Sequence, residues 1–125
     1  MERVDGVGGV FFRARDPERL LAWYREHPGV DPAPDFHGQE FEGGPTVWAL
    51  FPADTDYFGP SGQSLMVNYR VRDLDAMLAQ LRAAGVPVDD KVHEGEFGRF
   101  GWATDPEGNR FELWEGRRAS SADRG

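Results

Sequence analysis

The sequence contains no cysteine among its 125 residues. This absence excludes disulfide bonds, zinc sites built from thiolates and cysteine nucleophiles. The chain also lacks an apolar run of membrane-spanning length, and its first residues lack the basic-then-apolar pattern of a secretion signal. We therefore expect a cytoplasmic protein that has no membrane partner.

Positive charge is scarce. Lys and Arg together number 14 against 22 Asp and Glu, which gives a formal net charge of −8 at pH 7. Proteins that bind nucleic acids carry a basic surface, so we expect no nucleic-acid partner. The sequence has neither a glycine-rich phosphate-binding loop nor a nucleophile elbow. What remains is one domain of ordinary soluble composition, in which 13% of the residues are aromatic.

Two segments that lie 57 residues apart repeat one pattern. The first, RARDPERLLAWYREHPGV, begins at Arg13, and the second, RVRDLDAMLAQLRAAGVPV, begins at Arg70. Each predicts a strand and then a helix, with Asp16 or Asp73 as the N-cap that accepts hydrogen bonds from the first helical turn. Short strand patterns follow each helix. The repeat predicts an α+β fold of two βαβββ modules, whose mixed sheets form a cup around a shared cleft.

The alternation of apolar and polar residues places the expected strands at 8–14, 38–42, 46–51, 65–71, 89–94, 98–104 and 109–114. The last strand of the first module, around 55–58, has a weak pattern. The modules are expected at about 6–60 and 63–115, within a single domain of residues 1–118. Residues 119–125 are polar and are expected to form a flexible tail.

The segment DPEGNRFELWE, residues 105–115, joins a tight turn to a strand that carries a carboxylate. Alternation puts Phe111 and Leu113 on one face of this strand, and Glu112 on the other face between Arg110 and Trp114. One interpretation is an exposed edge strand with a weak Arg–Glu pair. We favour the lining of a pocket, because a carboxylate beside apolar neighbours loses hydration unless it is paired.

These segments resemble the vicinal oxygen chelate superfamily, which includes glyoxalase I, bleomycin-resistance proteins and extradiol dioxygenases. The resemblance rests on FFRARDPERLLAWYREHPGV, VNYRVRDLDAMLAQLRAAGV and EFGRFGWATDPEGNRFELWE, and it covers roughly residues 6–115. It implies paired βαβββ modules in a cupped sheet, usually within a homodimer. For metal-using members it also implies four ligands, carried by the first and last strands of the two modules.

Only one of those four ligand positions holds a residue suited to a divalent metal. Glu112 stands at the last position, whereas the others hold Gly9, Met66 and, by a 54-residue offset that also aligns Trp48 with Trp102, Phe58. Glycine and phenylalanine cannot ligate, and a thioether is a soft ligand. We therefore expect no cofactor. If a metal does bind, the resemblance leaves Glu112 with His37 or His93 to hold it.

Alternation predicts a mixed lining for the cup. The residues expected there, besides Glu112, are Phe11, Arg13, Met66, Asn68, Arg70, Arg110 and Trp114, with Trp48, Phe58 and Trp102 as candidates whose orientation the pattern leaves open. Aromatic rings with a few polar groups are typical of pockets for small organic molecules. The arginine heads could instead lie in water or neutralise the carboxylate, and the two tryptophans could belong to the core.

Three functions fit this pattern. The first is a metal-free small-molecule binding protein, similar to the bleomycin-resistance proteins, which sequester a drug. The second is a metal-free lyase or isomerase, in which Glu112 is a general base and Arg13 or Arg70 stabilises an enolate-like anion. The third is a glyoxalase- or dioxygenase-type enzyme with displaced metal ligands. We rank them in this order.

Overall fold

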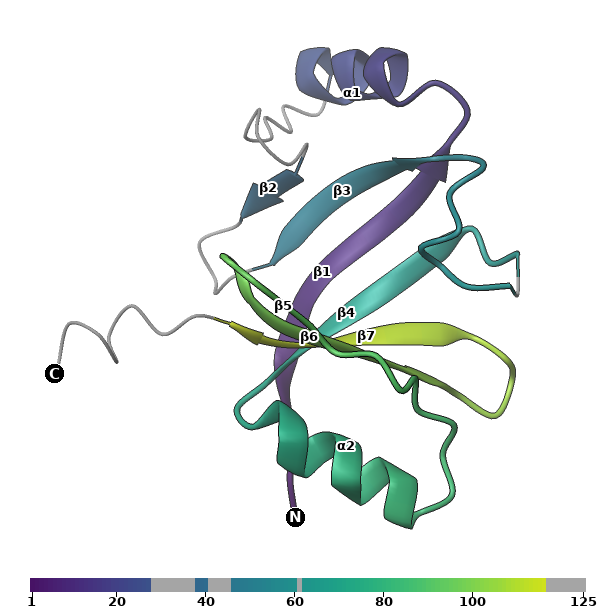
Figure 1. The fold of residues 1–125 in the computed structure, drawn as a ribbon. Helices are drawn as coiled ribbons and strands as arrows, with labels where there is room; N and C mark the ends of the chain where they lie inside the picture. Colours follow the sequence, from purple (N-terminus) through teal and green to yellow (C-terminus); the bar gives the residue numbers. More distant parts are fainter. Residues whose placement is uncertain (28–37, 41–45, 61, 117–125) are drawn as a thin grey trace, which may run out of the picture.

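The computed structural model describes residues 1–27, 38–40, 46–60 and 62–116, and it forms one curved sheet with a helix near each end (Figure 1). His37 and the tail 119–125 lie outside the described residues. In chain order the elements are β1 (Val4–Ala14), α1 (Pro17–Glu26), β2 (Gly38–Glu40), β3 (Val47–Pro52), β4 (Leu65–Val71), α2 (Leu74–Ala83), β5 (His93–Gly95), β6 (Gly98–Thr104) and β7 (Arg110–Gly116).

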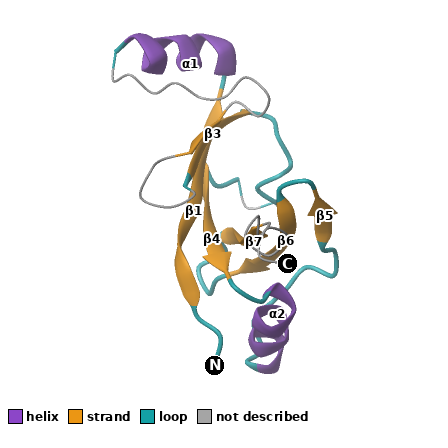
Figure 2. Cartoon of the chain, turned by 90° about the vertical axis from the view of Figure 1, so that its left-hand side faces the viewer, coloured by secondary structure: helices purple, strands orange, loops and turns teal. Residues whose placement is uncertain are grey.

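Both helices begin at their predicted N-caps. The Asp16 carboxylate accepts a hydrogen bond from the backbone N–H of Arg19 at 3.2 Å, and Asp73 accepts one from Ala76 at 3.0 Å. These bonds satisfy N–H groups that have no partner within the helix. The two helices lie at opposite ends of the sheet (Figure 2), and neither is long and apolar enough to cross a membrane, as far as the described part of the chain extends.

The sheet confirms the predicted duplication. In the described residues its seven strands follow the order β2-β3-β1-β4-β7-β6-β5, with the antiparallel pair β1 and β4 at the centre. β3 runs parallel to β1, and β7 runs parallel to β4, so the two modules are arranged symmetrically about the central pair. The structure therefore has the cupped mixed sheet that the sequence predicts.

The predicted strand around 55–58 is wrong. Residues 53–58 form turns and a bend instead, so the described part of the first module has three strands. Backbone bonds from Thr55 to Pro52 and from Gly59 to Asp56, both 3.0 Å, close two successive turns, and Gly59 has a φ of 81°. Aspartate, proline and glycine favour such turns over a ladder. The weak pattern here therefore marks a turn segment, residues 53–59.

The two faces of the sheet carry separate cores. On one face, α2 packs against the sheet through Leu74, Met77, Leu78, Val71 and Leu113. The cup-side cluster contains Phe11, Ala49, Phe58, Met66 and Trp102. Since strand side chains alternate, Leu113 packs beneath the helix while Glu112 points to the cup.

Candidate functional site

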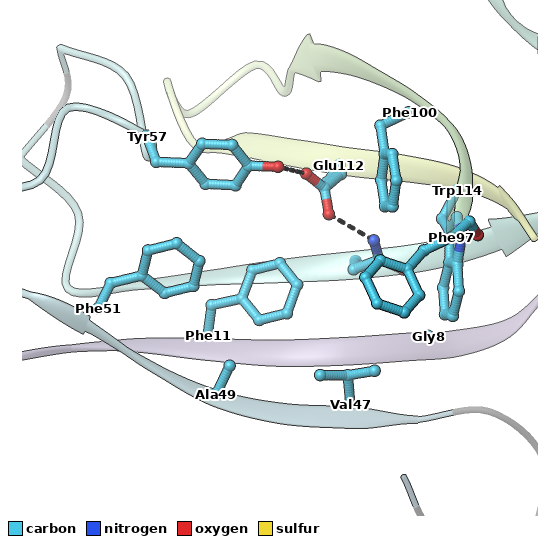
Figure 3. A pocket seen from close by; sticks show the side chains of 11 residues that line it. Gly8, Phe11, Val47, Ala49, Phe51, Tyr57, Phe97, Phe100, Glu112 and Trp114 are labelled. Carbon is cyan, nitrogen blue, oxygen red and sulfur yellow. Dashed lines mark hydrogen bonds between the residues drawn. The ribbon is translucent and has the colours of Figure 1, made fainter. Parts of the chain in front are cut away.

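The cup contains a cavity of about 230 Å³, which Figure 3 shows from close by. Side chains from five strands border it, together with Tyr57 from the turn segment and Phe97 from the β5–β6 turn. The lining residues are Gly8, Phe11, Val47, Ala49, Phe51, Tyr57, Asn68, Phe97, Phe100, Glu112 and Trp114. Most of them are apolar, and six have aromatic rings. The cavity is therefore shaped for a mainly apolar molecule.

Glu112 is the polar centre of this lining and is only 1% exposed. Its Oε1 accepts a hydrogen bond from Asn68 Nδ2 at 2.6 Å, and its Oε2 accepts one from Trp102 Nε1 at 2.9 Å. The Tyr57 hydroxyl also donates to Oε2 (Figure 3). Asn68 and Trp102 are the residues paired with Glu112 on the neighbouring strands β4 and β6, so register alone places them on its face.

Burial dominates the protonation chemistry of this network. It raises the pKa of the Glu112 carboxyl, although the hydrogen bonds from Tyr57, Asn68 and Trp102 and the charge of Arg110 act to lower it. Burial, reinforced by the adjacent carboxylate, also raises the pKa of Tyr57. The tyrosine therefore keeps its proton and serves as a hydrogen-bond donor at neutral pH.

Two arginines hold the turn segment that delivers Tyr57. Arg13 donates to the carbonyl oxygens of Ala53 at 2.9 Å and Thr55 at 2.8 Å, and its guanidinium lies over the Phe58 ring. Arg110 donates to the Tyr57 carbonyl at 3.1 Å and forms an ion pair with Asp89. The segment is thus fixed by charged donors, and it brings the Tyr57 hydroxyl to Glu112.

The structure separates the predicted site residues into groups. Those that border the cavity are Phe11, Asn68, Glu112 and Trp114. Those that lie behind them in the cup-side core are Phe58, Met66 and Trp102. Trp48 is on the opposite face, where its ring meets Phe12 edge-on at 5.8 Å. Trp102 thus packs in the core, which was the alternative to lining the pocket, although its indole N–H still donates to Glu112.

None of the three predicted arginines borders the cavity within the described residues. Arg13 and Arg110 bind the turn segment, as described above, and Arg70 donates to the Val7 carbonyl at 2.8 Å. The predicted anion-stabilising role for Arg13 or Arg70 therefore has no support in their positions. Both side chains make hydrogen bonds with backbone carbonyl groups instead.

Strand pairing corrects the predicted counterpart of Glu112. Glu112 pairs with Asn68 between β7 and β4, and the equivalent pair between β3 and β1 is Ala49 with Phe11. Phe11 and Asn68 are 57 residues apart, the repeat distance of the two segments. The counterpart is therefore Ala49 rather than Phe58, and β3 corresponds to β7 rather than to β6.

These positions do not fit the divalent metal site that the family resemblance implies. Gly9, Ala49 and Met66 supply no nitrogen or oxygen side-chain ligand, and Met66 is fully buried. A Cβ at Gly9 would lie 2.8 Å from the Phe11 ring, so neighbouring atoms fill that space. Both oxygens of Glu112 already accept hydrogen bonds from the protein.

The described residues also offer no cluster of ligands for a metal ion at displaced positions. Within the described ranges, no three His, Asp or Glu side chains are grouped to hold an ion. His93 is exposed on β5, with its ring 6.0 Å from that of Phe100.

Several lining residues escaped the sequence analysis. Val47, Ala49 and Phe51 were missed because aligning Trp48 with Trp102 made Trp48 the candidate on this strand and left its orientation open. The alternation in VWALFP permits both faces, and the parallel pairing with β1 selects one. Tyr57 and Phe97 lie in turns, where alternation gives no orientation. Phe100 lies on the cup side of β6, and the prediction for that strand considered only Trp102.

Comparisons with known proteins agree with this geometry. A family model described as a glyoxalase-like domain matches residues 9–114. Methylmalonyl-CoA epimerase from Mycobacterium tuberculosis is similar at 23% identity, over 95% of this chain and 93% of that chain, with a TM-score of 0.67. A variant of the Streptomyces coelicolor epimerase, in complex with 2-nitronate-propionyl-CoA, is similar at 17% identity, over 93% and 100%, with a TM-score of 0.70.

A third solved structure, described as NAD-dependent benzaldehyde dehydrogenase from Legionella pneumophila, is similar at 16% identity over 87% of this chain and 98% of that chain, with a TM-score of 0.63. No curated protein matches the chain in sequence. At these identities the solved structures show a shared fold and leave the chemistry to be argued from the cavity itself.

Proposed function

Because the chain belongs to the glyoxalase-like domain family, within the vicinal oxygen chelate superfamily, we propose that its cup is a metal-free binding site for a small, flat organic molecule. The observation that carries this proposal is the cavity of about 230 Å³ with its largely aromatic lining. An apolar protein cavity of about 150 Å³ can hold benzene. This one has room for a ligand of one or two rings.

Two stacked pairs of aromatic rings support a flat ligand. Phe51 and Tyr57 stack with centroids 5.3 Å apart and planes 9° apart, and Phe100 and Trp114 stack at 5.9 Å and 5°. The pairs flank the carboxylate of Glu112 on opposite sides (Figure 3). Aromatic faces favour planar guests through offset or edge contacts. Glu112 organises this lining rather than binding a metal, since its oxygens are held by protein donors.

The test is a thermal-shift and tryptophan-fluorescence screen with neutral and cationic compounds of one or two aromatic rings. A ligand at about 100 times its Kd should raise the unfolding free energy by about 2.7 kcal/mol. Ala49→Leu fills the cavity and should abolish the shift, whereas Leu50→Met, on the opposite face of β3, should keep it. The proposal fails if no compound stabilises the protein, or if Ala49→Leu responds as the wild type does.

A second candidate, a metal-free proton-transfer enzyme, is favoured by the raised pKa of Glu112 at the cavity wall. A carboxyl with a raised pKa is suited to act as a general base near neutral pH. Its test is deuterium incorporation from D₂O into bound acyl compounds, followed by NMR. Exchange by the wild-type protein that persists in a chelator would argue against the displaced-metal alternative. Loss of this exchange in Glu112→Gln would support the enzyme over the binder.

The family resemblance also leads us to propose a homodimer in the cytoplasm. Its support is the resemblance alone. Light scattering coupled to gel filtration tests the dimer, and a monomer across the micromolar range would contradict it.

A further inference from the structure

We propose, on the basis of the binding function proposed above, that the ligand carries an N–H or O–H group that donates a hydrogen bond to Asn68 Oδ1, and that the cup rejects carboxylates. The cup would then recognise neutral or cationic aromatic donors, such as phenols, anilines and indole-type heterocycles. This assigns a chemical class to a cavity whose shape alone sets only ligand size and flatness.

Each side-chain donor group around the cavity already gives at least one hydrogen bond to a protein acceptor. The Tyr57 hydroxyl and Asn68 Nδ2 donate to Glu112. Trp114 Nε1 donates to the Phe97 carbonyl at 2.8 Å. In the described lining, one hydrogen of Asn68 Nδ2 remains beyond these bonds, and Asn68 Oδ1 is the side-chain atom that has no partner at all. A ligand that offers a donor can therefore pair with this oxygen, and one that offers only acceptors leaves it unpaired.

Asn68 Oδ1 is the acceptor that lacks a partner. Asn68 is 1% exposed, it borders the cavity, and its Oδ1 is the one buried side-chain polar atom without a hydrogen bond among the described residues. The amide presents its NH₂ end to Glu112 Oε1, and its oxygen therefore points away from that carboxyl group. Buried polar atoms are rarely left unpaired in native proteins, so this oxygen indicates a missing donor.

Gly8 makes the position of this oxygen possible. A Cβ at residue 8 would overlap Asn68 Oδ1 and would lie 2.9 Å from the Trp114 ring. Glycine therefore allows β1 to pass directly beside the amide. The absence of a side chain at residue 8 thus leaves the space that the unpaired oxygen occupies.

The charges near the cavity disfavour anions. No Lys, Arg or His side chain borders the described part of the lining, and the only charged group there is the Glu112 carboxylate. The guanidinium groups of Arg13 and Arg110 are engaged with the backbone of the turn segment and, for Arg110, with Asp89. A ligand carboxylate would lose its hydration and meet no cation, which is unfavourable in an apolar cavity.

The test compares three ligands of nearly equal shape on the wild-type protein: indole, which has an N–H donor, benzofuran, which has none, and indole-3-carboxylate. Isothermal titration should find that indole binds about tenfold more tightly than benzofuran, because only indole can pair with the buried oxygen. Indole-3-carboxylate should bind at least tenfold more weakly than indole.

Equal affinity for indole and benzofuran, or tighter binding of the carboxylate, would overturn this inference and leave the binding function intact. Failure of all three to bind would also overturn it, and the wider screen described above then decides the binding function separately. Asn68→Leu should reduce the indole-to-benzofuran ratio to about one. Met66→Leu, a buried change behind the lining, should leave that ratio unchanged. The wild-type comparison decides the matter even if Asn68→Leu does not fold.

Discussion

The two halves of the cup have the same backbone and opposite chemistry. Phe11 on β1 pairs with Ala49 on β3, whereas Asn68 on β4 pairs with Glu112 on β7, and the two pairs occupy equivalent positions in the duplicated sheet. The first module therefore contributes an apolar wall and the Tyr57 donor, and the second contributes the Glu112 carboxylate with the donors of Asn68 and Trp102. The duplicated backbone determines which positions face one another, and the residue types at those positions determine the chemistry of the contact.

The halves should also respond differently to mutation. The apolar wall is stabilised by burial, which depends on volume and varies gradually. The network centred on Glu112 of the second half joins three elements, with donors from β4, β6 and the turn segment of the first half. Removing its centre leaves several buried donors without an acceptor.

Replacement of Glu112 should therefore have the largest effect on the free energy of unfolding. Glu112→Ala leaves the donors of Tyr57, Asn68 and Trp102 unpaired, and we expect a loss of about 3–5 kcal/mol of unfolding free energy. Ala49→Gly at the equivalent position of the other half should cost only about 1 kcal/mol. Urea denaturation followed by tryptophan fluorescence measures both. Equal losses of unfolding free energy in Glu112→Ala and Ala49→Gly would contradict the contrast between an apolar half and a hydrogen-bonded half.

The apolar half is tested by Phe11→Ala. Phe11 is 8% exposed and packs within the cup-side core, so truncation should cost about 3 kcal/mol. Phe11→Leu keeps most of the volume and should cost about 1 kcal/mol. The enlarged cavity of Phe11→Ala should also shift the ligand screen toward bulkier compounds. A smaller cost for Phe11→Ala than for Phe11→Leu would contradict the burial argument.

The pH dependence of stability isolates the carboxylate. The pKa of Glu112 is raised in the folded state, so the folded protein binds its proton more tightly than the unfolded chain does. The contribution of Glu112 to the free energy of unfolding is complete below its ordinary pKa of 4.5, and it declines as the pH rises through the pKa of the folded state. Relative to Glu112→Gln, wild-type stability should fall from about pH 4.5 upward, by at most about 1.4 kcal/mol per pH unit.

A difference that rises with pH, measured by urea unfolding of both proteins across this range, would mean that the three hydrogen bonds outweigh burial. The ordinary charges of the surface titrate in both proteins and cancel in the comparison. The sign of the slope thus separates the two effects.

The helix caps should show the smallest effect and the closest agreement between modules. Asp16→Ala and Asp73→Ala each remove one N-cap bond and should each cost about 1 kcal/mol in thermal unfolding. Asn in place of either aspartate should restore most of the loss. A difference of more than about 1 kcal/mol between the two aspartates would indicate that the modules differ outside the cup as well.

Local rules account for what the sequence could predict. The repeat distance, the two N-caps and the faces of β7 follow from residue type and periodicity, and all appear in the structure. Alternation along β7 also placed Glu112 on the face opposite Phe111 and Leu113, because assigning faces within one strand needs no knowledge of its neighbours.

The partners of that carboxylate depend on strand pairing and turns, which periodicity does not encode. Asn68 and Trp102 meet Glu112 through register across β4, β7 and β6. Tyr57 arrives from the turn segment, where the repeat had suggested a strand. The wrong equivalence between Trp48 and Trp102 came from matching residue identity, whereas the sheet matches strands by pairing direction.

The network around Glu112 also gives the protein an internal spectroscopic label. The hydroxyl proton of Tyr57 and the indole proton of Trp102 are held by a single carboxylate, and both rings are in edge-to-face contact at 5.9 Å. Buried hydrogen-bonded protons exchange slowly with water. Two slowly exchanging proton resonances should therefore mark the wall of the cavity, and their movement would follow the arrival of a ligand without a dye or a tag.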